Sequence, residues 1–322
     1  MNIKGTYIFY EDGIEIARSH NIITKFGKRF ITSLIAGSLA FKTKSIAIGI
    51  GNTTETENDT RLEFEFYRSP VQIGSPDINT DTITGVSTYG VIFKTTLPND
   101  VSGVINEIGL YPSQSAGFTD YSDKYISSFE SNSMWLDEDN NNPELVLSPT
   151  PKIGEYLFKV SADPVTSPNT YSIKEYYLNT NFDISGYSIN DSFSLAFTQE
   201  DTNLDYVYAR FHSSDTDYYE ARFIGDSSIT NPNKIIKYDM STFFSGAYVS
   251  GNPIDTAINK ITIGVKSKTI SGTTVYLDGL RINDEDSFDP IYGLISRSTL
   301  DTPITKKLGR QLDIEYRLGL SF

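Results

Sequence analysis

Alternation of apolar and polar side chains is the feature that most constrains how this chain can fold. Near the C-terminal end, the apolar positions recur at every second residue: Ile314, Tyr316, Leu318, Leu320 and Phe322. A period of two is that of a β-strand with one buried face. Because an isolated strand or hairpin is at best marginally stable in water, this segment must join a sheet formed by other parts of the chain.

Composition agrees with a fold made of short strands. The 322 residues include 21 Tyr and 19 Phe, one Trp, 23 Gly and 13 Pro, which favours strands separated by turns over long helices. The length suits about two domains. There is no cysteine, so disulfides, thiol nucleophiles and cysteine-bound zinc are excluded.

The first group of strands begins with a hairpin and contains one predicted helix. IKGTYIFY and IEIARSHNII flank Asp12-Gly13, a favourable tight-turn pair. In TKFGKRFITSLIAGS, apolar residues recur at spacings of four, which predicts an amphipathic helix that ends near Gly37. SIAIGIGN, LEFEFYRSPVQIG, STYGVIFKTTL and VSGVINEIGLYP then read as strands.

A polar stretch from about Ala116 to Pro151 separates this group from a second one. From Gly154 to Ile282, strand-like segments follow one another without amphipathic helices between them, which is typical of an antiparallel sandwich. The terminal strand follows this second group. Its alternation alone leaves two arrangements open: the strand completes the first group, or it extends the sandwich.

The first group resembles a module of tailed-bacteriophage structural proteins. HNIITKFGKRFITSLIAG, SIAIGIGNTTETENDTRLEFE, VSGVINEIGLY and SRSTLDTPITKKLGRQLDIEYRLGLSF occur in the order found in that family. The resemblance implies a small α+β docking domain, one helix on a β-sheet, formed by residues 1–116 plus 293–322. It also implies other virion proteins as partners, a homo-oligomer for which a trimer is the leading expectation, and a place in a particle assembled in the host cytoplasm.

The second group, residues 119–288, resembles a jelly-roll carbohydrate-binding module or a laminin-G-like sandwich. YISSFESNSMW at its start and TTVYLDGLRIND at its end carry this resemblance. It implies an inserted β-sandwich and a host cell-surface glycan as a ligand. It also makes Glu130 and Asp278 candidates for a structural calcium site, although calcium needs six to eight oxygens. Two exposed carboxylates are the alternative.

One hairpin, DYVYARFHSSDTDYYEARF, offers a candidate binding surface. A five-residue turn at Ser213–Asp217 places Arg210 opposite Glu220 and predicts that Val207, Ala209 and Phe211 face the core. The opposite face carries the candidate glycan-binding residues, which are Tyr206, Tyr208, Arg210, His212, Tyr218 and Arg222. Aromatic rings and charged hydrogen-bonding groups suit sugars. An ordinary solvated sheet face is the alternative.

Charge and motifs exclude several other functions. With 27 basic and 41 acidic residues, the net charge is −14, so a nucleic-acid partner is not expected. FITSLIAGSLAF is too short to span a membrane, and MNIKGTYIFYEDG has no apolar signal core, so we expect neither membrane insertion nor export by an N-terminal signal. Asp137–Glu144 is expected to be a mobile acidic loop, because it lacks the spacing of a calcium-binding EF-hand loop.

No catalytic residues are predicted. The chain has two histidines, His20 and His212, and none of the common hydrolase or phosphate-binding motifs. We therefore expect a structural component of a phage tail, baseplate or fibre that displays an outward sandwich for host-glycan attachment, and not an enzyme. The alternatives are a capsid or neck decoration protein without receptor binding, and a phage-borne glycan-degrading enzyme.

Overall fold

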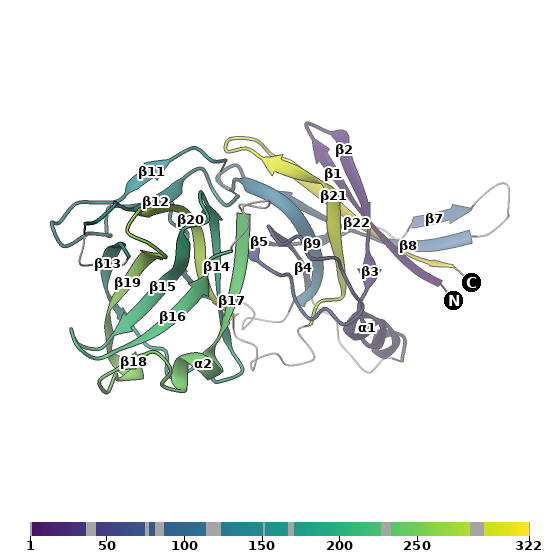
Figure 1. Cartoon of the computed structure of the whole chain (residues 1–322). Coiled ribbons are helices and arrows are strands. Elements are labelled where there is room, and N and C mark those ends of the chain that lie inside the picture. The colour runs from purple at the N-terminus through teal and green to yellow at the C-terminus, as the bar shows by residue number, and fades with distance from the viewer. Residues whose placement is uncertain are drawn as a thin grey trace. The chain divides into compact units, whose positions relative to one another are not determined.

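The computed structural model describes residues 2–36, 43–74, 77–80, 87–113, 124–150, 152–166, 171–226, 233–283 and 293–321. The chain divides into two compact units, unit 1 (Met1–Asp120 with Phe288–Phe322) and unit 2 (Tyr121–Ser287). Both consist mainly of antiparallel strands, and the predicted mainly β class is confirmed (Figure 1). The expected boundary positions 116, 119 and 288 lie outside the described residues. Within the described ranges, no helix has the length and apolarity that a membrane crossing requires.

Unit 1 contains two sheets and one helix, where the sequence predicted a helix on a single sheet. Sheet A has the strand order β2-β1-β22-β8-β6, with β7 also paired to β8, and sheet B has the order β3-β21-β9-β4-β5. Their apolar faces share one core, so each sheet covers the other. The elements are β1 (Asn2–Glu11), β2 (Ile14–His20), β3 (Ile22–Ile23), α1 (Lys25–Ile35), β4 (Thr43–Gly49), β5 (Glu65–Pro70), β6 (Gln72–Ile73), β7 (Asp77–Thr80), β8 (Ser87–Leu97), β9 (Gly103–Ser113), β21 (Ser296–Lys306) and β22 (Leu312–Ser321).

The N-terminal hairpin and the helix follow the sequence pattern. Asp12 and Gly13 both have positive φ, 52° and 77°, which is the backbone of a tight hairpin turn between β1 and β2. At the start of α1, the hydroxyl oxygen of Thr24 accepts a hydrogen bond from the N–H of Gly27 at 2.9 Å. Phe30 is buried in the core of unit 1. Gly37, expected to end the helix, lies outside the described residues.

The last strand, β22, lies between β1 and β8 along its whole length. Tyr316 is opposite Tyr7 on one side and Phe93 on the other. The ring centroids of Tyr316 and Tyr7 are 4.5 Å apart, and those of Tyr316 and Phe93 are 6.0 Å apart. The segment that follows unit 2 in the sequence therefore pairs with strands that precede unit 2.

A buried carboxylate, Glu107 on β9, binds several loops of unit 1 at once. It is fully buried and accepts hydrogen bonds from the N–H groups of Gly51 (3.0 Å), Glu63 (2.9 Å) and Phe64 (2.8 Å). It also accepts two bonds from the guanidinium group of Arg297 on β21, at 3.1 Å and 2.8 Å. One side chain thus links the glycine-rich end after β4, the loop before β5, and β21.

Arg297 completes this buried cluster. Its side chain is 4% exposed, and besides Glu107 it binds the carboxylate of Asp59 at 2.7 Å and the hydroxyl of Thr53 at 3.0 Å. Burial raises the pKa of Glu107, although the Arg297 charge and the amide donors oppose that rise. Arg297 therefore stabilises the charged form of this buried carboxylate.

Unit 2 is a sandwich of two antiparallel sheets. Sheet C has the order β11-β12-β20-β14-β17, with β10 also paired to β20, and sheet D has the order β13-β19-β15-β16-β18. One hydrophobic core lies between them. The elements are β10 (Lys124–Ser127), β11 (Glu144–Val146), β12 (Leu157–Ala162), β13 (Ile173–Phe182), β14 (Ser192–Gln199), β15 (Leu204–His212), β16 (Tyr218–Ile224), β17 (Asn233–Asp239), α2 (Met240–Phe244), β18 (Val249–Ser250), the 3₁₀ helix η2 (Asp255–Ala257), β19 (Ile258–Ser267) and β20 (Thr273–Asn283).

We predict that unit 1 folds without unit 2. Deleting residues 119–288 and joining the ends with a short flexible linker should leave a cooperatively folded protein, because both sheets of unit 1 use strands from outside the deletion. Circular dichroism during heating would measure this. A remainder without a cooperative transition would contradict it.

We also predict that Arg297→Ala strongly destabilises unit 1. Removing one partner of a buried ion pair costs about 3–5 kcal/mol, since the other charge stays buried. Amide hydrogen exchange in β9 and β21 would report the loss. Arg317→Ala is the matched control, because Arg317 is 46% exposed and its bond to Glu315 should contribute no more than about 1 kcal/mol. Equal protection in both variants would contradict the prediction.

Candidate functional site

The candidate surface lies on the outer face of sheet D, where the β15–β16 hairpin places it. The hairpin has the predicted register, with Arg210 opposite Glu220 and Ala209 opposite Ala221. Val207, Ala209 and Phe211 are fully buried in the core, as predicted. The side chains that alternate with them therefore point away from the core.

The neighbouring strand β19 and the strand beyond it, β13, add further side chains to this face. Thr262 on β19 is paired with Arg210 on one side and with Tyr177 of β13 on the other. Two residues further along these strands, Lys260 of β19 is paired with His212 of β15. These antiparallel pairs place side chains from three separate segments in rows across the sheet.

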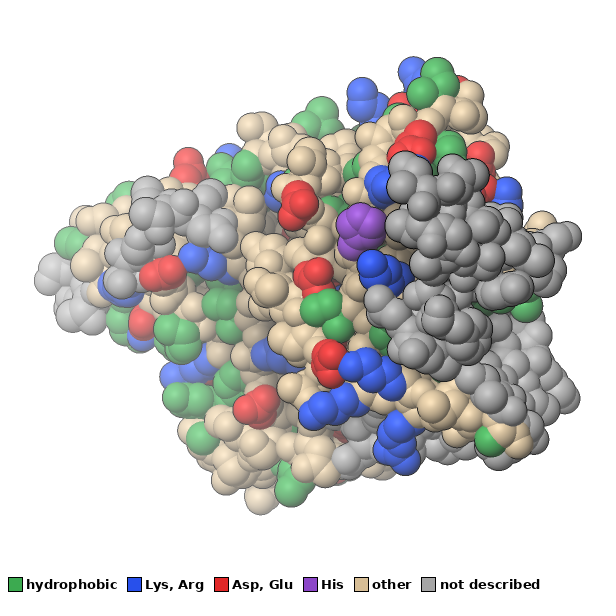
Figure 2. All heavy atoms as spheres, turned by 90° about the vertical axis from the view of Figure 1, so that its right-hand side faces the viewer, with side chains coloured by type: hydrophobic (Ala, Val, Ile, Leu, Met, Phe, Trp, Pro, Cys, Tyr) green, Lys and Arg blue, Asp and Glu red, His purple; other side chains and the backbone are tan. Residues whose placement is uncertain are grey.

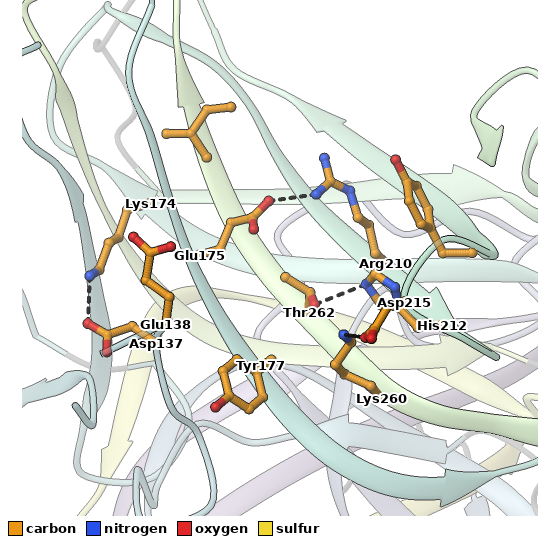
Figure 3. A pocket seen from close by; sticks show the side chains of 12 residues that line it. Asp137, Glu138, Lys174, Glu175, Tyr177, Arg210, His212, Asp215, Lys260 and Thr262 are labelled. Atoms are coloured by element: carbon orange, nitrogen blue, oxygen red, sulfur yellow. Dashed lines mark hydrogen bonds and ion pairs between the residues drawn. The ribbon is translucent and has the colours of Figure 1, made fainter. Parts of the chain in front are cut away.

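A groove of about 430 Å³ is hollowed into this face. The side chains labelled in Figure 3 come mainly from β13, β19 and β15, with Asp137 and Glu138, from the segment between β10 and β11, at one end. The lining of the groove combines aromatic rings with positively and negatively charged side chains that can form hydrogen bonds. It is lined by Asp137, Glu138, Ile173, Lys174, Glu175, Tyr177, Arg210, His212, Asp215, Tyr218, Lys260 and Thr262.

Tyr208 forms part of the support beneath the groove and is not itself accessible. It was predicted to contact a sugar, but it is only 1% exposed. Its ring lies across Gly264 of β19, where an added Cβ would come within 2.5 Å of the ring. Its hydroxyl reaches the carboxylate of Glu175 on β13. Burial and the Glu175 charge raise the pKa of Tyr208 well above its ordinary value, so the phenol stays protonated.

Arg210 is fixed by two carboxylates. Its Nε donates to Glu220 and its Nη1 donates to Glu175, each at 2.6 Å. Its guanidinium carbon lies 4.4 Å from the ring centroid of Tyr208 and 5.1 Å from that of Tyr218. Glu220 is 2% exposed and also accepts a bond from Arg222. The predicted cross-strand pair is therefore part of a larger, half-buried ionic network.

His212 lies at the floor of the groove in its neutral form. Its Nε2 is 3.1 Å from the hydroxyl of Thr262. Burial, with the positive charges of Lys260 and Arg210, lowers the pKa of His212 to about 4. At neutral pH this side chain therefore carries no charge, and its Nε2 is paired with Thr262.

The structure separates the six predicted residues into three sets. Arg210, His212 and Tyr218 line the groove, whereas Tyr208 lies beneath it. Tyr206 and Arg222 lie beside the groove and do not line it. The guanidinium group of Arg222 lies over the rings of Tyr206 (4.6 Å) and Tyr248 (3.7 Å).

Several groove residues were not predicted from the sequence. Glu175, Tyr177, Lys260 and Thr262 come from β13 and β19, which no short turn connects to the hairpin. Their outward alternation in YSIKEYYLN and KITIGVKS was the available signal. It could not reveal which strand would be the hairpin's neighbour.

Asp137 is buried, although a mobile acidic loop was expected around it. It is 4% exposed, binds Lys174 at 2.7 Å and accepts bonds from the N–H groups of Asp139 and Asn141. The bond from Lys174 is the main reason that the pKa of Asp137 is lowered to about 2. These bonds hold Asp137 in place at one end of the groove.

Glu130 and Asp278, the candidates for calcium, both bind backbone amides. The carboxylate of Asp278 accepts hydrogen bonds from the N–H groups of Lys152 and Ile153, at 2.8 Å and 3.1 Å. Glu130 accepts those of Glu155 and Tyr156 at 2.8 Å and 3.2 Å. Burial raises the pKa of both carboxyls, that of Asp278 to about 7, and the Glu130 charge adds to the shift at Asp278.

This pair supplies too few ligands for calcium by itself. Among the described residues, no group of three or more histidine or acidic side chains could hold a metal ion. Asp278 is only 3% exposed, so it is not the exposed carboxylate of the alternative interpretation. Calcium at Glu130 and Asp278 stays a prediction that would need further oxygen ligands from the backbone or water.

Comparisons with known proteins gave similarity at the level of structure only. No family model and no curated protein matches the chain. One similar solved structure is the family 11 carbohydrate-binding module from Clostridium thermocellum in complex with a β-1,3-1,4-mixed-linked tetrasaccharide, with 15% identity and a TM-score of 0.34, covering 50% of this chain and 94% of that one.

Two further structures have comparable similarity. The family 30 module of a cellulosomal cellulase of Clostridium thermocellum has 13% identity and a TM-score of 0.34, covering 51% of this chain and 91% of that one. The agarase AgWH50C has 11% identity and a TM-score of 0.32, covering 51% of this chain and 24% of that one.

We predict a pH-dependent contribution of Asp278 to stability in calcium-free buffer. The folded state keeps its proton up to a pH of about 7, whereas an unfolded Asp releases it near pH 3.9. The stabilisation is therefore complete below about pH 4 and is lost as the pH rises through 7, by about 1.4 kcal/mol for each unit by which the two pKa values differ.

Denaturant unfolding at several pH values, followed by Trp135 fluorescence, would measure this. Trp135 is the single Trp and lies buried in unit 2. The free energy of unfolding should fall from pH 4 to 7 relative to that of Asp278→Asn. A constant difference between the two proteins would contradict the prediction. If added calcium instead makes the free energy of unfolding rise over this pH range, the result would support the metal site.

Proposed function

We propose that unit 2 binds a glycan in the groove on sheet D. The observation that carries this proposal is the groove itself, which presents two tyrosines beside donors and acceptors held in fixed positions. Tyrosine rings stack on the C–H faces of sugars, and charged side chains bond their hydroxyls. The similar solved structures include carbohydrate-binding modules, but their TM-scores are too low to carry the proposal.

Unit 1 is proposed to hold the glycan-binding unit on a larger assembly. Its motifs resemble those of tailed-phage structural proteins, so the proposed assembly is a virion formed in the host cytoplasm. The edge strand β2 exposes Ile14 (69%) and Ile16 (45%), which suits contact with another protein. Figure 2 shows acidic and basic side chains beside one another on the face turned to the viewer.

Multiple copies would make a weak site effective. A dissociation constant in the millimolar range corresponds to a binding free energy of about −4 kcal/mol. Copies on one particle raise the effective affinity by about 10² to 10⁴. We propose a homo-oligomer, with a trimer as the leading expectation. Sedimentation of the pure protein would measure its mass, and labelling of purified particles would locate it.

Binding without catalysis is proposed, because three of the four carboxylates that line the groove already have ion-pair partners. Asp137 binds Lys174, Asp215 binds Lys260, and Glu175 binds Arg210. Incubating a bound glycan with the protein and analysing it by chromatography tests this. Release of shorter products would favour the glycan-degrading alternative.

We predict that Tyr218→Ala weakens glycan binding without unfolding unit 2. Tyr218 lies on the groove wall, with its ring 5.0 Å from His212. Losing one stacking ring should reduce affinity by about tenfold. A glycan array, followed by calorimetry with any glycan bound, would measure the effect.

Two control variants show whether a loss of affinity is specific to the groove. Tyr276→Ala removes a tyrosine from β20 in sheet C and should leave affinity unchanged. Phe211→Ala should destabilise unit 2, since its buried ring contacts Phe193 and Phe243. Equal affinity of the Tyr218→Ala protein and the wild type would remove the groove as the binding site.

A further inference from the structure

Two polar atoms in the groove have no partner among the described residues. Arg210 uses Nε for Glu220 and Nη1 for Glu175, which leaves Nη2 as a spare donor. Oε1 of Glu175 accepts from both Tyr208 and Arg210, which leaves Oε2 as a spare acceptor. The side chains of Arg210 and Glu175 are 22% and 40% exposed, so a ligand can reach them (Figure 3).

The protein holds this donor and acceptor together from below. Because residue 264 is a glycine, the Tyr208 ring can lie across β19 and bond Glu175 two strands away. The same ring lies 4.4 Å beneath the Arg210 guanidinium. Buried Glu220 fixes the other edge of Arg210. The two groups are thus oriented before any ligand arrives, which lowers the entropy cost of binding.

We propose that Arg210 and Glu175 recognise two neighbouring hydroxyl groups on an uncharged sugar residue. Nη2 of Arg210 donates to one hydroxyl, and Oε2 of Glu175 accepts from the next. Tyr208 is the positioning residue for both. This inference rests on the glycan-binding function proposed above and adds the chemical class of the ligand.

Charge in the groove favours an uncharged sugar over an acidic one. Lys174 and Lys260, the other cations of the lining, already bind Asp137 and Asp215. Glu138 adds a negative charge to the lining without an ion-pair partner among the described residues. With His212 neutral, the lining holds four carboxylates against three cations, so an anionic sugar meets net repulsion, whereas a hydroxyl can both donate and accept.

The test begins with the full chain on an array of neutral and uronic-acid-containing glycans. A neutral glycan that binds is then compared with its analogue in which one of two adjacent hydroxyls is replaced by hydrogen. The wild type should bind the parent at least about tenfold more tightly, since the analogue leaves a polar group of the protein unpaired.

Two variants then ask whether this preference depends on the proposed groups. Glu175→Gln removes the charged acceptor, and Tyr208→Phe keeps the ring on Gly264 but removes the hydroxyl. Each should bind the parent about tenfold more weakly and lose most of the preference over the analogue. Tyr276→Phe is the matched control, because it also removes a tyrosine–glutamate bond, to Glu200 at 3.2 Å, but on sheet C.

The outcomes separate the inference from the function on which it rests. If no glycan binds, the proposed function fails. If only uronic-acid-containing glycans bind, or if Glu175→Gln and Tyr208→Phe keep the wild-type preference, glycan binding stands and the recognition by Arg210 and Glu175 is wrong. Weakened binding with an unchanged preference would assign Tyr208 and Glu175 a merely structural role and would also overturn it.

Discussion

The buried pair of Glu107 and Arg297 connects parts of unit 1 that 190 positions of sequence separate. Burying a carboxylate is costly unless it is paired and hydrogen-bonded. Glu107 meets that condition only when Gly51, Glu63, Phe64 and Arg297 are all in place. Motifs that looked separate in the sequence therefore meet at one carboxylate, and the fold of unit 1 requires both segments that flank unit 2.

In unit 2, the corresponding constraint is the lack of a side chain at position 264, which is a glycine. Gly264 lets the Tyr208 ring of β15 lie across β19, so that its hydroxyl reaches Glu175 on β13. A larger residue there would come too close to the Tyr208 ring and separate Arg210 from Glu175. The arrangement of the groove thus follows from one backbone position as much as from the charged residues on its surface.

Local patterns predicted what depends on local geometry. The alternation of residues 314–322 predicted a strand, the Ser213–Asp217 turn fixed the register of Arg210 with Glu220, and Asp12-Gly13 predicted a hairpin. The patterns could not predict non-local neighbours. Glu175 and Thr262 reach the site through strand pairs that no turn specifies, and the burial of Tyr208 depends on a glycine more than 50 positions away.

The position of β22 has a consequence for how the protein is made. During translation, β1 and β8 leave the ribosome long before the strand that lies between them. Until β22 appears, each has an open edge of the kind that promotes aggregation, whereas unit 2 can already fold, since domains generally fold as units. A chain cut short within unit 2 could never close sheet A. A chain that stops before β22 therefore lacks the strand that joins β1 to β8 and cannot present an intact unit 1.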